Sequence, residues 1–272
     1  MYKSKHYNFI ITPIFNILEE SVIACRGIGD GIETQTISEY ILQTTFLKMT
    51  GASEQKLKCI CWELATNDYE YRYQYLNKNY GECSKYKDKN DIYTDLIKAI
   101  IKLDTSLLKD VGEGESFILK LIKDSDDSNK FTNSICDGII NLVKNSTFSL
   151  FASKDFSYFY SNYNTFFDNK EFAILKPNKD NDDGFNAYLL KGKNGKGGLQ
   201  KYFESIVYRH RNRCAHNLTS YQENLPTLST LSEKDYDYNN YFFRFSLLIL
   251  IDEIFIRLYK KYIEALKNNS YA

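Results

Sequence analysis

Several residue types that would define a functional class are scarce in this sequence. Proline and histidine occur three times each in 272 residues, and 35 basic residues balance 35 acidic ones. Without net charge, binding to a polyanion would depend on a local basic cluster and not on an overall field. No apolar run reaches the ~18 to 20 residues of a membrane span, and the start, MYKSKHYNF, has no apolar signal segment. We therefore expect a cytoplasmic protein that does not enter a membrane.

The six cysteines are not arranged as a metal site or a disulfide framework. Cys59 and Cys61 are two residues apart in a predicted helix, where their side chains do not share a face, and the other four are isolated: Cys25, Cys83, Cys136 and Cys214. Zinc sites usually contain C-x₂₋₄-C pairs, and disulfide frameworks belong to small secreted chains. We expect free, mostly buried thiols and no metal site.

Common nucleotide- and cation-binding motifs are also missing. The segment GKNGKGG at 192–198 lacks the hydroxyl residue and the preceding strand of a P-loop, and is better explained as a flexible loop. Acidic residues at 124–127 and 180–183 lie in Asn- and Ser-rich turns without the terminal Glu of an EF-hand. The sequence therefore indicates no cofactor.

What the chain does contain is apolar residues at helical spacing, and 43% apolar residues in all, enough for a substantial core. We interpret the chain as one all-α domain spanning 1–272, a helical bundle. The spacing predicts helices over 7–26, 37–51, 53–76, 92–108, 116–123, 131–151, 199–214 and 239–267. Glycines at 27 and 51 are expected to end the first two, and Ser53 to cap the third.

The region 153–198 differs in composition, being rich in Tyr, Phe, Asn, Asp and Gly. Two short apolar runs, 172–175 and 187–190, flank the polar tract PNKDNDDG as the arms of a β-hairpin would. We predict a polar insertion here, either a hairpin packed on the body or a segment ordered by a partner.

The scarce histidines are concentrated in one place. The stretch YRHRNRCAHN, residues 208–217, holds two of the three histidines and three of the seven arginines. Arg209 and Arg213 are four residues apart on one helical face, where like charges repel unless an anion of about phosphate size lies between them. Arg211 and His216 would point ~140° apart in a continuous helix, so we expect the helix to kink or fray near Cys214.

The segment Arg211-Asn212-Arg213-Cys214-Ala215-His216 resembles the R-x₄₋₆-H signature of the HEPN superfamily of all-helical RNA nucleases. Its position at a helix end before a final apolar helix is also that of the family. The resemblance implies a HEPN-like bundle, metal-independent RNA cleavage, and a homodimer whose two motifs meet across a two-fold axis. Small prokaryotic members commonly act as toxins or phage-defence effectors, so an antitoxin or regulatory protein would be a further partner.

Residue chemistry assigns roles within this motif. The neutral-range pKa of histidine suits His216 as the base that takes the proton of a 2′-hydroxyl. The Arg211 guanidinium would stabilise the phosphorane, and Asn212 would orient it or the phosphate. This attack would leave 2′,3′-cyclic phosphate and 5′-hydroxyl ends.

The remaining residues of the stretch would contact RNA around this centre: Arg209, His210, Arg213 and Asn217. Two alternatives stay open. His210 continues the apolar face of Phe203 and Ile206, which favours a packed histidine over a catalytic one, and Arg209 with His216 satisfies the family pattern in a longer register.

Two other function classes remain. One is a non-catalytic HEPN-like module that binds RNA, nucleotide or a partner protein. The other is an unrelated helical interaction protein that dimerises through its last helix. The complete Arg-Asn-x₃-His favours the nuclease, but nothing in these residues selects tRNA over mRNA as its substrate.

Overall fold

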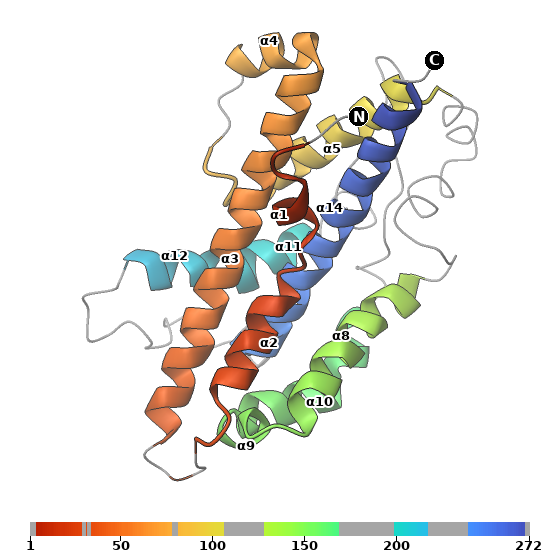
Figure 1. Ribbon diagram of the computed structural model, residues 1–272. Coiled ribbons are helices and arrows are strands. Elements are labelled where there is room, and N and C mark those ends of the chain that lie inside the picture. Colours follow the sequence, from red (N-terminus) through yellow and green to blue (C-terminus); the bar gives the residue numbers. More distant parts are fainter. Residues whose placement is uncertain are drawn as a thin grey trace.

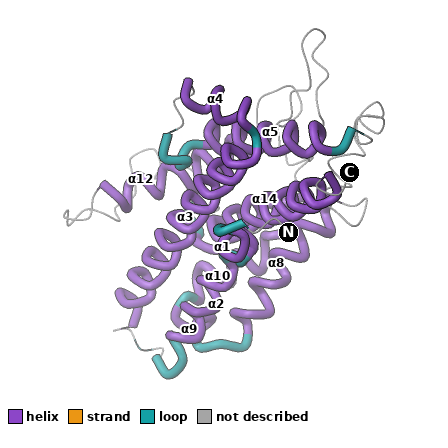
Figure 2. Tube along the Cα trace, turned by 45° about the horizontal axis from the view of Figure 1, so that its top comes forward, coloured by secondary structure: helices purple, strands orange, loops and turns teal. Residues whose placement is uncertain are grey.

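The computed structural model describes residues 4–28, 31, 34–77, 81–105, 128–168, 199–216 and 239–269. Every regular element in these ranges is a helix (Figures 1 and 2), so the all-α prediction is confirmed for the described part of the chain. The predicted hairpin arms at 172–175 and 187–190 and the short helix at 116–123 lie outside the described residues.

The last helix, α14 (Tyr241–Asn269), is the central element of the bundle. It packs against α1 (Tyr7–Ile11), α3 (Thr34–Asn67), α5 (Tyr86–Leu103), α8 (Ser128–Lys144) and α10 (Ser153–Asp168). A helix with neighbours on all sides needs apolar residues on all sides, which explains the run FFRFSLLILIDEIF. Within the described ranges, no helix is both long and apolar enough to cross a membrane.

The start of α14 is capped by polar side chains. The Asn240 side-chain oxygen accepts the backbone N–H of Phe242 at 2.9 Å, which satisfies one of the open donors of the first turn. The Asn240 amide donates to the Asp155 backbone carbonyl at 2.7 Å, and the Asp155 carboxylate accepts the Tyr241 N–H at 3.1 Å. The beginning of α14 is thereby joined to α10.

α10 occupies the first part of the predicted insertion. Residues 153–168 are a helix and not the beginning of an irregular segment. Phe156, Phe159 and Phe166 are buried and pack on Phe242 and Phe243 of α14. Their spacing of three and seven residues is helical, so the core includes α10 as far as Phe166 and does not end where the insertion was predicted to begin.

The N-terminal half also differs from the predicted boundaries. The expected helix over 7–26 is two, α1 and α2 (Phe15–Ala24), since Pro13 lies between them and cannot continue a helix. Gly27, with φ of +89°, stands after α2, where glycine commonly ends helices. α3 continues through Gly51, which was expected to end a helix, and is followed by α4 (Tyr69–Asn77).

The basic stretch lies on a helical segment that crosses α3 (Figure 1). It consists of α11 (Leu199–Tyr202), a π-helical turn η3 (Phe203–Tyr208) and α12 (Arg209–His216). Arg244 of α14 donates through Nε to the Ile206 carbonyl at 3.1 Å, which fixes η3 against the central helix. α8 is followed by the short α9 (Phe148–Phe151), which precedes α10.

Candidate functional site

α12 gives each residue of the basic stretch a different environment. Arg209 is exposed, His210 is buried, and Arg211, Asn212 and Arg213 are half-buried. The helix contacts α3 on one side, so its residues alternate between the core and the surface. Arg209, Arg211 and Asn212 therefore remain within reach of a bound molecule.

His210 is part of the core, with 5% of its surface exposed. Its Nδ1 lies 2.8 Å from Arg213 Nη2, and its Nε2 lies 3.1 Å from the Tyr241 hydroxyl. Because a guanidinium can only donate, Nδ1 is the acceptor and the ring proton is on Nε2. The ring also packs on Phe46 at 5.0 Å between centroids. These are the surroundings of a packed histidine, the alternative that its apolar helix face favours.

Burial and two neighbouring cations keep His210 neutral. Desolvation, with the positive charges of Arg244 and Arg213, lowers the His210 pKa to about 2. Arg244 is itself buried, and desolvation lowers its pKa to about 10. Arg213 is turned toward His210, and its buried Nε has no hydrogen-bond partner among the described residues. Any contact of Arg213 with RNA would thus compete with its bond to His210.

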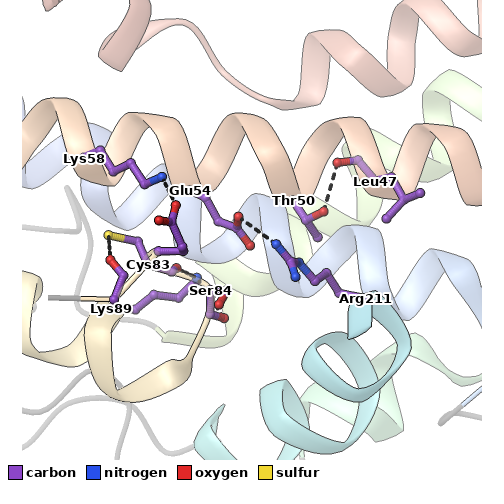
Figure 3. A network of polar contacts seen from close by, with 10 residues as sticks. Leu47, Thr50, Glu54, Lys58, Cys83, Ser84, Lys89 and Arg211 are labelled. Atoms are coloured by element: carbon purple, nitrogen blue, oxygen red, sulfur yellow. Dashed lines mark hydrogen bonds and ion pairs between the residues drawn. The ribbon is translucent and has the colours of Figure 1, made fainter. Parts of the chain in front are cut away.

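Arg211 forms an ion pair with α3. Its Nη2 lies 3.2 Å from Glu54 Oε2, with 27% of the Arg211 side chain and 13% of the Glu54 side chain exposed. Figure 3 shows Arg211 reaching from α12 toward this carboxylate. A second ion pair joins Lys58, one turn along α3, to Glu82. The proposed catalytic arginine is therefore held by a carboxylate from a distant part of the chain.

A small pocket lies beside this ion pair, between α3, α5 and η3–α12. Its polar lining includes Thr50, Ser53 and Glu54 of α3, with Ser84, Lys89, Tyr208 and Arg211, and its apolar walls are Phe203, Val207 and Leu248. The enclosed space is close to that of a single water molecule. A larger ligand would need one lining side chain to move.

Lys89 is the most enclosed charge in this pocket, with 2% of its surface exposed. Its Nζ donates to the Cys83 and Ser84 carbonyls, the second at 3.4 Å, and lies 5.0 Å from the centre of the Phe203 ring. Cys83 has φ of +60°, an uncommon conformation for a residue other than glycine. Burial lowers the Lys89 pKa to about 8, so at pH 7 the ammonium form predominates.

α12 is helical through Cys214 and Ala215 to His216, so the helix does not break at Cys214, where we expected it to kink or fray. Positions 211 and 216 are then ~140° apart around the helix axis, and positions 209 and 216 are within ~20°. Asn217, expected to contact RNA, lies outside the described residues. One continuous helix does not bring positions 211 and 216 to one face.

Sequence reasoning did not find Glu54 or Lys89. A signal existed for Glu54: Thr50, Glu54 and Lys58 follow one another at intervals of four along one side of a helix. Lys89 gave no signal, because a lysine in a helix is normally solvated. The six cysteines, all within the described ranges, form no disulfide; five are buried, and Cys59 is half-buried. No group of acidic, histidine and cysteine residues suited to a metal ion occurs in the described ranges.

Comparison with known proteins gives no relative from which a role could be transferred. The chain matches no protein-family model, no curated protein and no solved structure.

Proposed function

We propose that this protein is a metal-independent endoribonuclease of the HEPN type, a cytoplasmic toxin or phage-defence effector restrained by an antitoxin or regulatory protein. The observation that carries the proposal is the position of Arg211. Its guanidinium is partly exposed at a small pocket lined by both polar and apolar residues, next to the half-buried Asn212 and on the helix that carries His216. A fixed cation at an accessible polar surface is what phosphoryl chemistry without a metal requires.

In this proposal the RNA supplies its own nucleophile. His216 takes the proton of a 2′-hydroxyl, the oxygen attacks the adjacent phosphorus, and the bond to the 5′-oxygen of the next nucleotide breaks. The leaving 5′-oxygen takes a proton from water, and His216 returns its own proton to the solvent. Arg211 stabilises the charge that develops on the phosphorane, with two parallel N–H donors suited to two phosphate oxygens. The products carry 2′,3′-cyclic phosphate and 5′-hydroxyl ends.

The continuous helix favours a site assembled from two copies of the chain. Because positions 211 and 216 face ~140° apart, Arg211 of one copy would act with His216 of a second copy. The HEPN resemblance implies the same two-fold arrangement. The longer register, Arg209 with His216 on one face, would need no second copy.

Purified protein incubated with total RNA in EDTA tests the proposal. We expect cleavage, cyclic phosphate ends, and a loss of at least ~10²-fold on His216→Ala, the size typical of a general base. His6→Ala is the matched control, since His6 lies at the start of α1, outside the site, and should keep full activity. Dependence on a divalent metal, or 5′-phosphate ends, would show that a metal-activated water attacks instead.

The ion pair of Arg211 with Glu54 favours one second candidate, a non-catalytic module that binds RNA or nucleotide. A carboxylate that neutralises the arginine would weaken its stabilisation of a transition state, while the pocket beside it would remain for binding. Binding of RNA without cleavage, with or without Mg²⁺, would select this candidate.

A further inference from the structure

The pocket beside Arg211 has more positive than negative charge in its lining. It contains two cations, Lys89 and Arg211, and one carboxylate, Glu54. Glu54 pairs with Arg211, and the nearby Lys58 pairs with Glu82. Lys89 contacts two carbonyls and an aromatic face, and no carboxylate lies within ion-pair distance of it in the described part of the chain. The pocket thus carries one positive charge without a counter-ion.

Such a buried charge is costly. An ammonium group loses its hydration when it is removed from water, and this cost must be offset by other charged or polar groups. The contacts of Lys89 with carbonyl groups offset part of this cost. An anion that enters through the exposed edge of the pocket could offset the rest. The acidic groups that act on Lys89 are Glu54 first and then Asp88, while Arg211 opposes its charge. Lys89, Glu54 and Arg211 are therefore close enough to interact electrostatically.

We propose that this pocket is a binding subsite for a phosphate group of the RNA backbone, held by Arg211 and Lys89, and that Glu54 is the anion that such a phosphate replaces. The proposal rests on the proposed function for the identity of its ligand. The site itself rests on the lining residues and their charges.

Shape and size support the exchange. Glu54 occupies one Arg211 donor, Nη2, through one carboxylate oxygen, and a phosphate oxygen could take its place while a second phosphate oxygen accepts from another N–H of the guanidinium. The present space holds about one water, so a phosphate enters only if the Glu54 side chain moves away. Ser53, buried on α3, and Tyr208 add hydroxyl groups to the same lining.

Two variants with opposite expected effects test the subsite. Lys89→Met removes the uncompensated charge, and Glu54→Gln removes the competing anion. The probes are inorganic phosphate, followed by thermal unfolding, and a single-stranded 2′-O-methyl oligonucleotide, followed by fluorescence anisotropy. The 2′-O-methyl group blocks the nucleophile, so binding is measured without cleavage. Lys87→Met is the matched control, because Lys87 is exposed on the same helix.

We expect Lys89→Met to weaken oligonucleotide binding about tenfold at low salt and to lower the salt slope by ~0.7, the release of one counter-ion from a single strand. Glu54→Gln should tighten binding several-fold, and Lys87→Met should have no effect. Phosphate should raise the unfolding temperature of the wild-type protein and of Glu54→Gln, but not of Lys89→Met. If Lys89→Met does not fold, the Glu54→Gln variant alone tests the proposal. Oligonucleotide binding that is unchanged or weaker in Glu54→Gln overturns the subsite.

The outcomes for the subsite and for the nuclease are distinguishable. Stabilisation by phosphate that depends on Lys89, without any binding or cleavage of RNA, supports an anion site and overturns the RNA function. Cleavage of RNA in EDTA that is lost on His216→Ala, with no effect of Lys89→Met or Glu54→Gln on either probe, supports the function and overturns the subsite.

Discussion

Asp252, halfway along the central helix α14, accepts hydrogen bonds from two other parts of the chain. Lys56 Nζ of α3 lies 2.7 and 2.9 Å from its two carboxylate oxygens, and the Ile14 backbone N–H lies 2.9 Å from one of them. Lys56 also donates to the Thr12 carbonyl. Both side chains are buried. This pair joins α14, α3 and the α1–α2 junction inside the core.

Removing one partner of this pair should be far more damaging than removing both. Asp252→Ala leaves the Lys56 charge and the Ile14 N–H unpaired, so we expect it to lower the free energy of unfolding by about 3 to 5 kcal/mol, whereas replacing both with apolar residues can be nearly neutral. Urea unfolding of Asp252→Ala and of the double variant Lys56→Met/Asp252→Leu measures this difference.

A neighbouring residue provides the control for this prediction. Glu253→Gln removes only a half-exposed i,i+4 pair with Arg257 and should cost less than about 1 kcal/mol. A loss equally small for Asp252→Ala would show that the buried pair does not hold the three elements together.

His210 should make the fold sensitive to acid. Its pKa in the fold, about 2, is far below its ordinary value of 6.5, so the unfolded chain takes up a proton below pH 6.5 that the folded chain does not. The contribution of His210 to the free energy of unfolding is thus fully present above pH 6.5. Below pH 6.5 it decreases by about 1.4 kcal/mol per pH unit. Urea unfolding at pH 7.5 and pH 5 measures the loss.

His210→Gln isolates this contribution, because glutamine can donate and accept hydrogen bonds but does not titrate in this range. The variant should be less stable at pH 7.5, and its stability should fall by about 2 kcal/mol less than that of the wild-type protein down to pH 5. Equal losses in wild type and His210→Gln would mean that His210 is protonated in the fold.

How far the sequence predicts the fold depends on which signal each helix carries. α14 was predicted to within two residues at each end, because its long apolar run is flanked by polar segments. α10 was missed because half of its residues are Tyr, Ser or Asn, and its burial against Phe242 and Phe243 outweighs their low helix propensity. Pro13 divides α1 from α2, and no apolar spacing reveals that.

Gly51 shows the same competition between local preference and packing. Local propensity predicts a helix end at glycine, but α3 continues because the helix as a whole is packed on α2, α5 and α14. A Cβ added at Gly51 would meet nothing within 4 Å. We therefore expect Gly51→Ala to raise the free energy of unfolding by about 0.5 to 1 kcal/mol. A destabilised variant in urea unfolding would show that the glycine is required.

From the sequence, we could predict only those residues of the candidate site that lie close together along the chain. Arg209, Arg211 and Asn212 stand out as a cluster, and their accessibility follows from the helix period. Glu54 and Lys89 meet Arg211 from 157 and 122 residues away along the chain. Such meetings depend on how α3, α5 and α12 cross, which apolar spacing does not specify.

Arg209 should contribute binding and not chemistry. It is exposed at the start of α12 and no described carboxylate pairs with it. We expect Arg209→Ala to weaken RNA binding and lower the salt slope by ~0.7, with little loss of turnover at saturating RNA. Arg26→Ala, which removes another exposed arginine, should change neither. If Arg209→Ala abolishes turnover while Arg211→Ala only weakens binding, the motif acts in the longer register.

Mixing two inactive variants tests whether the site is shared between copies. Arg211→Ala and His216→Ala should each lower cleavage at least ~10²-fold, since both groups act mainly in the transition state. In a dimer that combines Arg211 of one copy with His216 of the other, co-expression of the two variants rebuilds one intact site. Random pairing makes about half of the dimers mixed, each with one of two sites intact, so about a quarter of wild-type activity should return.

The control for this experiment is Arg211→Ala co-expressed with the double variant Arg211→Ala/His216→Ala. No pairing of these chains contains an intact Arg211, so activity should stay at the level of the single variants. Light scattering should show a dimer in every preparation. If neither mixture recovers activity although the dimers form, Arg211 and His216 of one chain act in the same site. Because these positions lie ~140° apart on a continuous helix, that result would require α12 to unwind before His216 when RNA binds.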